Sequence, residues 1–168
     1  VSKDVYWVDG TPADCVSIGL NIIKDNIDLV VSGCNNGLNI SVDTLYSGTI
    51  GACLQSLVHR LPSVAFSTPV NNFEIVEKYF DKAYEFIMSN KLLSTEYLLN
   101  VNFPYGSEIK DIKLAKLYYR NDIHNFIEQN DGYLGSREVE KDISYEDTDC
   151  FMAEHSIISV TPLEKTLF

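Results

Sequence analysis

Two short polar segments carry residue types that could bind a divalent cation and a phosphate. Ser32 to Asn39 holds three asparagines, whose amide oxygens suit a hard cation, and it follows the apolar run 27–31. Further along, Tyr46-Ser47-Gly48-Thr49 opens a helical pattern, and a helix N-terminus offers free N–H groups to a phosphate. Plainer interpretations stay open, because Asn and Gly also make ordinary turns and Ser or Thr also caps ordinary helices.

Other arrangements typical of enzymes are absent from the sequence. His59, His124 and His155 lack the spacing of a histidine metal site, which favours structural or solvent-exposed roles. There is no Gly-x-Ser-x-Gly elbow, no Walker A loop and no Gly-x-Gly-x-x-Gly loop. The stretch 147–149 is acidic, but no second carboxylate cluster accompanies it. No catalytic residue is therefore identified from residue types in this chain.

The elements around the two segments alternate between strand and helix through the first hundred residues. A capping box, Thr11 to Asp14, predicts the start of a helix. The β-branched run 27–31 suits a strand buried on both faces of a parallel sheet. Further strands are predicted at 5–8, 62–67 and 98–103, and further helices after Thr49 and at 73–88. The last of these helices should bury one face, made of Phe73, Val76, Phe80, Tyr84 and Ile87.

The regular alternation of predicted strands and helices ends after Pro104. A strand is predicted at 112–119 and another at 156–161, whereas 122–149 is too polar to form a core and reads as a projecting arm. The prediction is an α/β, Rossmann-like three-layer sandwich with a mostly parallel sheet and a projecting C-terminal β-hairpin arm. Residues 1–110 are predicted to form the α/β body, and 111–168 the C-terminal strands and an oligomerisation arm of the same domain.

Composition limits the partners and the compartment. The formal net charge is -11, which disfavours duplex nucleic acid and anionic membranes as partners. No apolar run approaches the roughly 20 residues of a transmembrane helix, and the first residues do not resemble a signal peptide. The four cysteines form no Cys-x-x-Cys pair and are expected to be reduced thiols, mostly buried, in a cytoplasmic protein.

Several segments in order resemble the SurE family of survival proteins, which are divalent-metal-dependent nucleoside monophosphate phosphatases. The similar segments are Gly10 to Val16, Asp28 to Asn39, Tyr46 to Thr49, Pro62 to Ala65, Leu99 to Pro104, Thr148-Asp149 and Ser159 to Leu163. They run almost the full length of the chain in the family's order, and this order makes the resemblance specific.

The resemblance implies a role for each matching residue. Asn35 would be a metal ligand for a divalent ion of the Mg or Mn type. Ser47, Gly48 and Thr49 would hold the phosphate of a nucleoside monophosphate or another small phosphomonoester. Gly33 and Asn39 would shape the loop. SurE proteins also form dimers and tetramers through C-terminal arms, so a homodimer or tetramer is expected.

The chain departs from the family pattern at one important point. The family opens with a strand that ends in Asn-Asp-Asp-Gly, and its two adjacent aspartates bind the metal, but this sequence contains no Asp-Asp pair. The sequence starts without Met, and we expect roughly seventy residues of the family pattern to be missing before Val1, including the first strand and helix of the sheet. A site with Asn35 as its only protein ligand should hold a cation poorly. The alternative to an active nucleotidase is therefore an inactive SurE-like remnant that binds phosphate or serves in oligomerisation.

Overall fold

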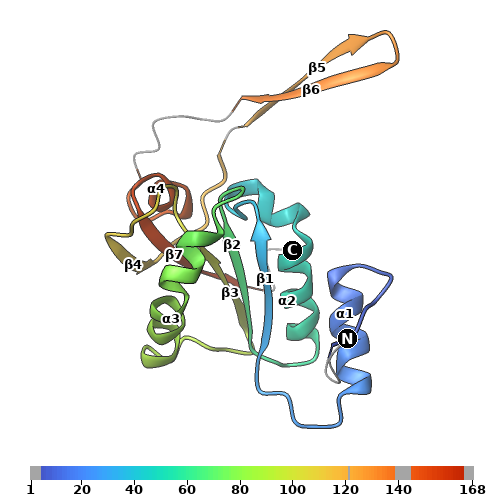
Figure 1. Cartoon of the computed structure of the whole chain (residues 1–168), viewed down its shortest axis with the longest axis vertical. Helices are drawn as coiled ribbons and strands as arrows, with labels where there is room; N and C mark the ends of the chain where they lie inside the picture. The colour runs from blue at the N-terminus through green and yellow to red at the C-terminus, as the bar shows by residue number, and fades with distance from the viewer. Residues whose placement is uncertain (1–4, 121, 139–144, 165–168) are drawn as a thin grey trace.

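A five-stranded sheet forms the centre of the computed structural model, which describes residues 5–120, 122–138 and 145–164. Its strand order is β1-β2-β3-β7-β4 (Figure 1). The strands are β1 (Val30–Asn36), β2 (Ser63–Thr68), β3 (Tyr97–Asn102), β7 (Ile157–Glu164) and β4 (Asp111–Leu114). The pairs β1–β2, β2–β3 and β4–β7 are parallel, and β3–β7 is antiparallel. The predicted α/β class with a mostly parallel sheet is thus confirmed.

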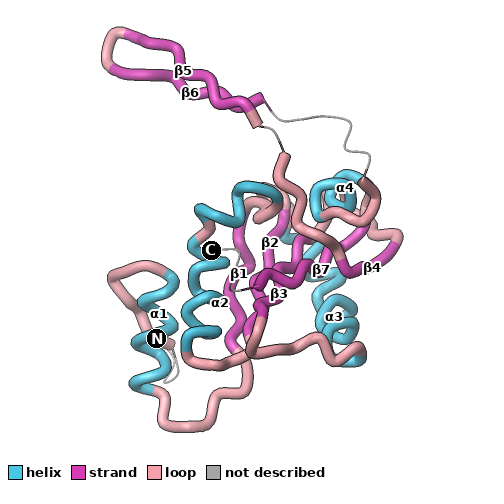
Figure 2. Tube along the Cα trace, turned by 180° about the vertical axis from the view of Figure 1, so that it is seen from behind, coloured by secondary structure: helices cyan, strands magenta, loops and turns pink. Residues whose placement is uncertain are grey.

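Helices cover both faces of the sheet. The helix α2 (Gly48–Val58) packs on one face, where Ile50, Cys53 and Leu57 bury against strand residues such as Leu98. The helix α3 (Phe73–Ser89) covers the other face over a larger core. Figures 1 and 2, seen from opposite sides, both place the sheet between these two helices. Burial of apolar side chains on both faces is the main stabilising contribution to this layered arrangement.

The helix α1 (Pro12–Ile22) lies outside α2, on the side away from the sheet, in both views (Figures 1 and 2). It contains no buried residue. Its start is fixed locally by the predicted capping box, in which the Thr11 hydroxyl accepts from the Asp14 N–H and the Asp14 carboxylate accepts from the Thr11 N–H. Local signals therefore define the start of α1, and its contact with α2 holds it to the body.

A two-stranded hairpin projects from the body (Figure 1). It pairs β5 (Ile123–Gln129) with β6 (Gly132–Glu138), so the predicted hairpin arm is present. Two short elements complete the chain: the 3-10 helix η1 (Ser41–Tyr46), just before α2, and α4 (Asp149–Glu154), just before β7. None of the helices in the described ranges combines the length and the hydropathy that a membrane crossing requires.

Two strand predictions near the N-terminus are wrong. Residues 5–8 form no strand. The predicted strand 27–31 begins at Val30 and continues to Asn36, through residues that were expected to form a loop. It is also the edge strand of the described sheet, and Val31 is 52% exposed, so it is not buried on both faces. An apolar run shows that a segment can be buried but not which neighbours it will have, and the fully buried strand is β2.

Two further boundaries differ from the prediction. The buried face of α3 consists of Ile75, Tyr79, Ala83 and Ile87, whereas Phe73 and Tyr84 are exposed. Of the predicted face, Ile87 is buried and Val76 and Phe80 pack partly buried against the core, but the centre of the buried face lies at Ile75, Tyr79 and Ala83. The predicted strand 112–119 is shorter, since β4 ends at Leu114.

Candidate phosphate-binding site

The two polar segments singled out in the sequence lie at the same edge of the sheet. Strands β1 and β2 run parallel, so Asn35 and Asn36 at the end of β1 lie beside Ser67 and Thr68 at the end of β2. The helix α2 starts at this edge and packs against β1 and β2 on its way down (Figure 1). The carboxyl edge of parallel strands is where open α/β sheets bind their ligands.

The end of β1 has an irregular backbone that only glycine permits at one point. Gly33 has a φ of +116°, and a Cβ built there would lie 2.3 Å from the Phe66 carbonyl oxygen. The pairing of β1 with β2 shifts register between Ser32 and Asn35, and the Gly33–Cys34 peptide bond is cis. Close approach of β1 to β2 at Gly33 therefore sets the direction in which Asn35 leaves the strand.

Asn35 closes a tight turn with its own side chain. Its Nδ2 donates to the Gly37 carbonyl oxygen at 2.7 Å, and the Gly37 N–H donates to the Thr68 carbonyl oxygen at 2.9 Å. The neighbouring Asn36 side-chain oxygen accepts from the Asn71 N–H at 2.7 Å. The loop that follows β1 is thus tied to the end of β2 rather than free in solution.

Asn39 is the anchor of the loop and belongs to a buried amide network. Its N–H donates to the Asn102 side-chain oxygen at 2.8 Å, and its Nδ2 donates to the Ser67 hydroxyl at 2.7 Å. Its carbonyl oxygen accepts from the side chains of Asn100 at 2.7 Å and Asn102 at 3.1 Å. All four side chains are buried, and these hydrogen bonds hold the loop to β2 and β3, although the Asn100 side-chain oxygen has no hydrogen-bond partner among the described residues.

Asn100 and Asn102 were missed as site residues in the sequence. A signal for them existed: they lie two positions apart in a predicted strand, so their side chains project from the same face of the sheet. Two amides on one face of a buried strand need partners. The nearby Asn-rich loop was the obvious source of those partners.

Ser47 is the N-cap of α2. Its hydroxyl accepts from the Ile50 N–H at 3.2 Å, and its carbonyl oxygen accepts the first helical hydrogen bond, from Gly51 N–H, at 2.9 Å. The N–H groups of Gly48 and Thr49 belong to the first turn, which has no partner within the helix. They point along the helix axis towards the carboxyl edge of the sheet, where the helix dipole favours an anion.

Gly48 lies close to the start of α1, a contact that the sequence did not suggest. A Cβ on Gly48 would lie 3.1 Å from Cγ and 3.4 Å from Cδ of Pro12, the first residue of α1. The Gly-Thr-Pro segment and the Ser-Gly-Thr segment, far apart in the sequence, thus meet at the starts of two helices. The absence of a side chain at Gly48 leaves room for Pro12.

The acidic patch at 147–149 has a structural role. The Asp149 carboxylate is buried and accepts from the backbone N–H groups of Ser41 at 3.0 Å, Tyr118 at 3.1 Å and Cys150 at 2.8 Å. Burial raises its pKa, and these hydrogen bonds act in the opposite direction. Thr148 caps α4. Asp149 therefore holds the start of η1, and through it the chain that enters α2.

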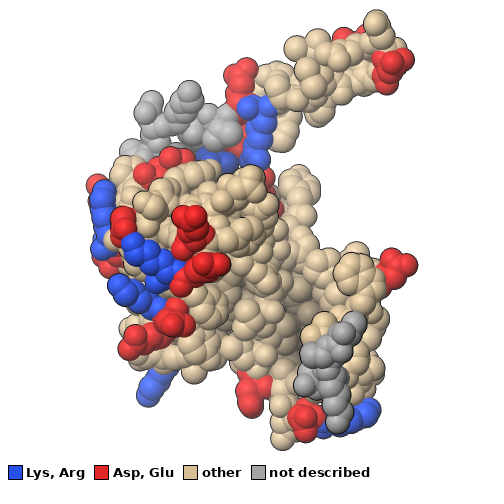
Figure 3. Space-filling view, viewed as in Figure 1, with Lys and Arg blue, Asp and Glu red and all other residues tan. Residues whose placement is uncertain are grey.

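Little fixed positive charge is visible on this face of the molecule. Figure 3 shows charged side chains gathered over α3 and the C-terminal elements, while the middle of the face, over β1 and α2, carries mostly uncharged side chains. With a net charge of -11, the chain as a whole repels a phosphate. The first-turn N–H groups of α2 carry the partial positive charge that suits an anion at this edge.

The described residues do not supply a complete set of ligands for a divalent cation by themselves. Within 5–120, 122–138 and 145–164, no three His, Cys, Asp or Glu side chains come together as a metal site. A Mg or Mn ion takes about six oxygen ligands and favours carboxylates, whereas the end of β1 offers neutral Asn35 and its neighbours. His59, His124 and His155 lie on separate elements: the end of α2, the hairpin and the end of α4.

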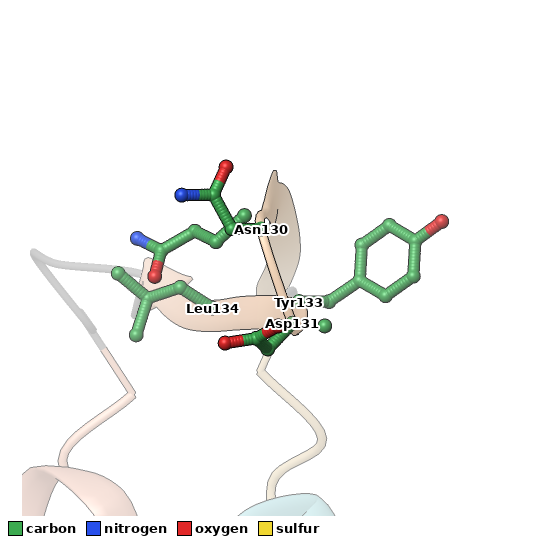
Figure 4. A pocket seen from close by; sticks show the side chains of 6 residues that line it. Asn130, Asp131, Tyr133 and Leu134 are labelled. Atoms are coloured by element: carbon green, nitrogen blue, oxygen red, sulfur yellow. The ribbon is translucent and has the colours of Figure 1, made fainter.

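A concave region at the tip of the hairpin is not a plausible second site. It is lined by residues 129–134, and Figure 4 shows the Tyr133 ring extending to the side opposite Asn130 and Leu134. These side chains do not converge on a common point, and the tip projects away from the body (Figure 1). The start of α2 remains the better candidate.

Comparison with known proteins identifies the family. The model of the family described as "Survival protein SurE" matches residues 1–123. The 5'-nucleotidase SurE of Clostridium botulinum (strain ATCC 19397 / Type A) is 38% identical over 98% of this chain and 69% of its own length. That of Clostridium beijerinckii is 35% identical over 94% of this chain and 67% of its own length.

A solved structure agrees. The SurE protein from Aquifex aeolicus superposes with a TM-score of 0.77 at 32% identity, over 93% of this chain and 67% of its own. The chain thus spans about two thirds of the length of these relatives. Since the family model covers most of the chain, and the sequence and the fold agree with it, the chain belongs to the SurE family of survival proteins.

Proposed function

We propose that the protein is a phosphomonoesterase that acts on nucleoside monophosphates. The observation that carries the proposal is the start of α2, where the first-turn N–H groups at Gly48 and Thr49 lie at the carboxyl edge of the sheet, on the edge that Asn35 also occupies. The relatives from Clostridium are named 5'-nucleotidases. Phosphate is the part of a nucleotide that such a helix start would bind.

The residues implied by the resemblance have distinct parts in this proposal. Ser47, Gly48 and Thr49 bind the phosphoryl group through N–H groups and hydroxyls. Gly33 and Asn39 set the path of the loop, which their contacts with Phe66 and the Asn102 side chain support. Asn35 stands at the same edge as one ligand of a divalent ion of the Mg or Mn type.

A second candidate function has its own supporting observation. Among the described residues, no three His, Cys, Asp or Glu side chains gather as a metal site, and a hard cation bound by neutral amides alone is held weakly. The alternative is therefore a SurE-like chain that binds phosphate or assembles with partners but does not turn over substrate by itself. The absence of an Asp-Asp pair from the sequence favours this reading for the chain alone.

Two measurements on the purified chain separate the candidates. Release of inorganic phosphate from adenosine 5'-monophosphate is followed with MnCl₂, with MgCl₂ and with EDTA, and binding of inorganic phosphate and of the nucleotide is followed by calorimetry. Turnover with metal and none with EDTA supports the nucleotidase. Binding without turnover supports the alternative, and neither binding nor turnover contradicts both.

We also propose that the chain forms a homodimer or tetramer through the hairpin arm. Both faces of the hairpin carry exposed apolar side chains: Ile123, Phe126, Ile127, Tyr133 and Leu134. An isolated two-stranded hairpin is only marginally stable in water, so these side chains favour burial against another copy. In this scheme residues 1–110 form the body and 111–168 the C-terminal strands and arm of one domain. Strands β4 and β7 support the single domain, because they extend the sheet of the body.

A cytoplasmic location completes the proposal. All four cysteines are free, with Cys53 and Cys150 buried and Cys15 exposed. Burial raises the pKa of Cys34 to about 11 and that of Cys53 to about 12, which keeps both as neutral thiols. Free thiols are usual in reducing compartments.

A further inference from the structure

No linker residue separates η1 from the start of α2, where the proposed phosphate site lies. η1 ends at Tyr46, and the next residue, Ser47, is the N-cap of α2. Any shift of η1 therefore moves Ser47 directly, and with it the position of the hydroxyl and of the first-turn N–H groups. What holds η1 also determines where a phosphate can sit.

The hairpin reaches η1 through one arginine. Arg137 on β6 donates from Nη1 to both carboxylate oxygens of Asp43 on η1, at 2.8 and 3.1 Å. The two residues are 94 positions apart in the sequence. The contact is specific, because a guanidinium fixes direction as well as charge.

The other side of the same guanidinium is fixed at the root of the hairpin. Its Nε donates to the Asp122 carboxylate at 3.0 Å, and Nη2 contacts the same oxygen. Arg120 also donates to Asp122, at 3.3 Å, and the Arg120 N–H donates to the Ser41 hydroxyl at 2.9 Å. The guanidinium of Arg137 thus bridges Asp43 and Asp122. The Asp122 side chain is only 2% exposed, so this bridge is held firmly at its Asp122 end.

The ion pair between Arg137 and Asp43 differs from an ordinary surface pair. Their side chains are 29% and 33% exposed, compared with 78% and 58% for the ion pair of Lys116 and Asp147. Exposed pairs contribute little because water screens them, whereas a partly buried arginine held on both sides loses little further freedom.

We propose that Arg137 and Asp43 are positioning residues for the phosphate-binding end of α2, and that they couple the placement of the hairpin to phosphate affinity. This inference rests on the proposed binding of phosphate at Ser47, Gly48 and Thr49. If the hairpin docks against another copy of the chain, that assembly stabilises the bridge and so tightens phosphate binding. Arg137 and Asp43 themselves touch no substrate in this scheme.

The test compares three variants of the full chain. Asp43→Asn removes the charge that Arg137 binds but leaves Arg137 paired with Asp122, so folding is preserved. Asp43→Glu keeps the charge and is the conservative rescue. Asp147→Asn is the matched control, because it makes the same chemical change and breaks the Lys116–Asp147 pair, measured at 2.6 Å, without touching η1.

Two readouts are taken on each variant: the dissociation constant for inorganic phosphate by calorimetry, and amide hydrogen exchange over residues 41–50. Asp43→Asn should weaken phosphate binding on the order of fivefold or more and speed exchange in 41–50, with an unchanged urea midpoint. Asp43→Glu should recover most of the affinity, and Asp147→Asn should match the wild type. Where turnover is measurable, the change should appear in KM with kcat unaltered.

Any other result counts against the inference or against the proposed function on which it rests. Wild-type phosphate affinity in Asp43→Asn overturns the inference while the proposed function stands. A wild type that binds no phosphate overturns the proposed function. In that case amide hydrogen exchange alone tests whether the Arg137–Asp43 pair positions α2. Faster exchange confined to 41–50 in Asp43→Asn supports the positioning of α2, and unchanged exchange overturns it.

Discussion

Pro12 and Gly48 meet at the starts of α1 and α2, where a Cβ on Gly48 would approach Cγ of Pro12 to 3.1 Å. This distance is tighter than ordinary packing, so Gly48→Ala should push α1 away from α2. We expect the free energy of unfolding to fall by about 1 kcal/mol, the low end of overpacking costs. Phosphate affinity should fall too, because a strained start of α2 displaces the first-turn N–H groups that are proposed to bind phosphate. Urea unfolding and calorimetry measure the two effects.

Gly51 on the same helix provides the matched control. A Cβ there would meet nothing within 4 Å. Gly51→Ala should therefore raise the free energy of unfolding by roughly 0.5–1 kcal/mol through helix propensity alone. Equal stabilisation by both substitutions would show that Pro12 moves away from the new methyl group at little cost, and that Gly48 is not needed for packing.

Ser47 has two separable roles, as a helix cap and as a phosphate ligand. Ser47→Ala removes the acceptor of the Ile50 N–H and should cost about 1 kcal/mol of stability, whereas Ser47→Gly should cost only a few tenths. Both variants lack the hydroxyl, so both should bind phosphate more weakly by a similar factor. Phosphate affinity that follows stability instead, with the Gly variant near the wild type, would assign Ser47 to capping alone.

The capping box of α1 gives a pH dependence with a definite sign. Hydrogen bonds from the Thr11 N–H and hydroxyl lower the pKa of the exposed Asp14 below its ordinary value of 3.8. The box therefore contributes fully above that value and is lost as the pH falls through the lower, folded-state pKa. Amide exchange at the first turn of α1, compared at equal chemical exchange rates, should show more opening at pH 3 than at pH 6.

Thr11→Ala should produce a similar loosening at pH 6, worth about 1 kcal/mol or roughly fivefold in exchange. Ser17→Ala, in the middle of the same helix, is the control and should not loosen the first turn. If acidification leaves the first turn of wild-type α1 unchanged, the box does not depend on the ionised carboxylate.

The hairpin should govern assembly. Ile127 and Leu134 face each other across the β5–β6 ladder, and they are 61% and 54% exposed. Ile127→Asp should shift the mass measured by light scattering to that of a monomer, because burial of the charge in an interface is unfavourable. Glu128→Gln, at the neighbouring position, should leave the mass unchanged. A monomeric wild type would refute assembly through the hairpin at the outset.

Much of the body could be predicted because its signals are local. The start of α1 follows from Thr11 to Asp14, the start of α2 from Ser47, and the hairpin from its polar, glycine-containing strands. These features depend on residues within a few positions of each other. The predicted metal and phosphate residues also lie at one sheet edge, because the ends of parallel strands must meet there.

The other features depend on contacts between residues far apart in the sequence, which the sequence alone does not reveal. The edge position of β1 follows from strand order, and the burial of Tyr79 and Ala83 on α3 follows from how the helix packs on the sheet. Arg137 belongs to a polar hairpin with no pattern that points to η1, so its contact with Asp43 could not be foreseen. Asn100 and Asn102 stood on one face of a predicted strand, and this alternation was an available signal.

Assembly order follows from how far apart in the chain the pieces of the α2 entrance lie. Asn39 bonds Asn102 across 63 residues, and Ser41 bonds Asp149 across 108. Contacts of such long separation form slowly, because a long loop must close before they are rewarded. During synthesis, Ser47 leaves the ribosome long before Asp149 exists, so the hydrogen bond that fixes Ser41 ahead of α2 forms only after residue 149 has been made.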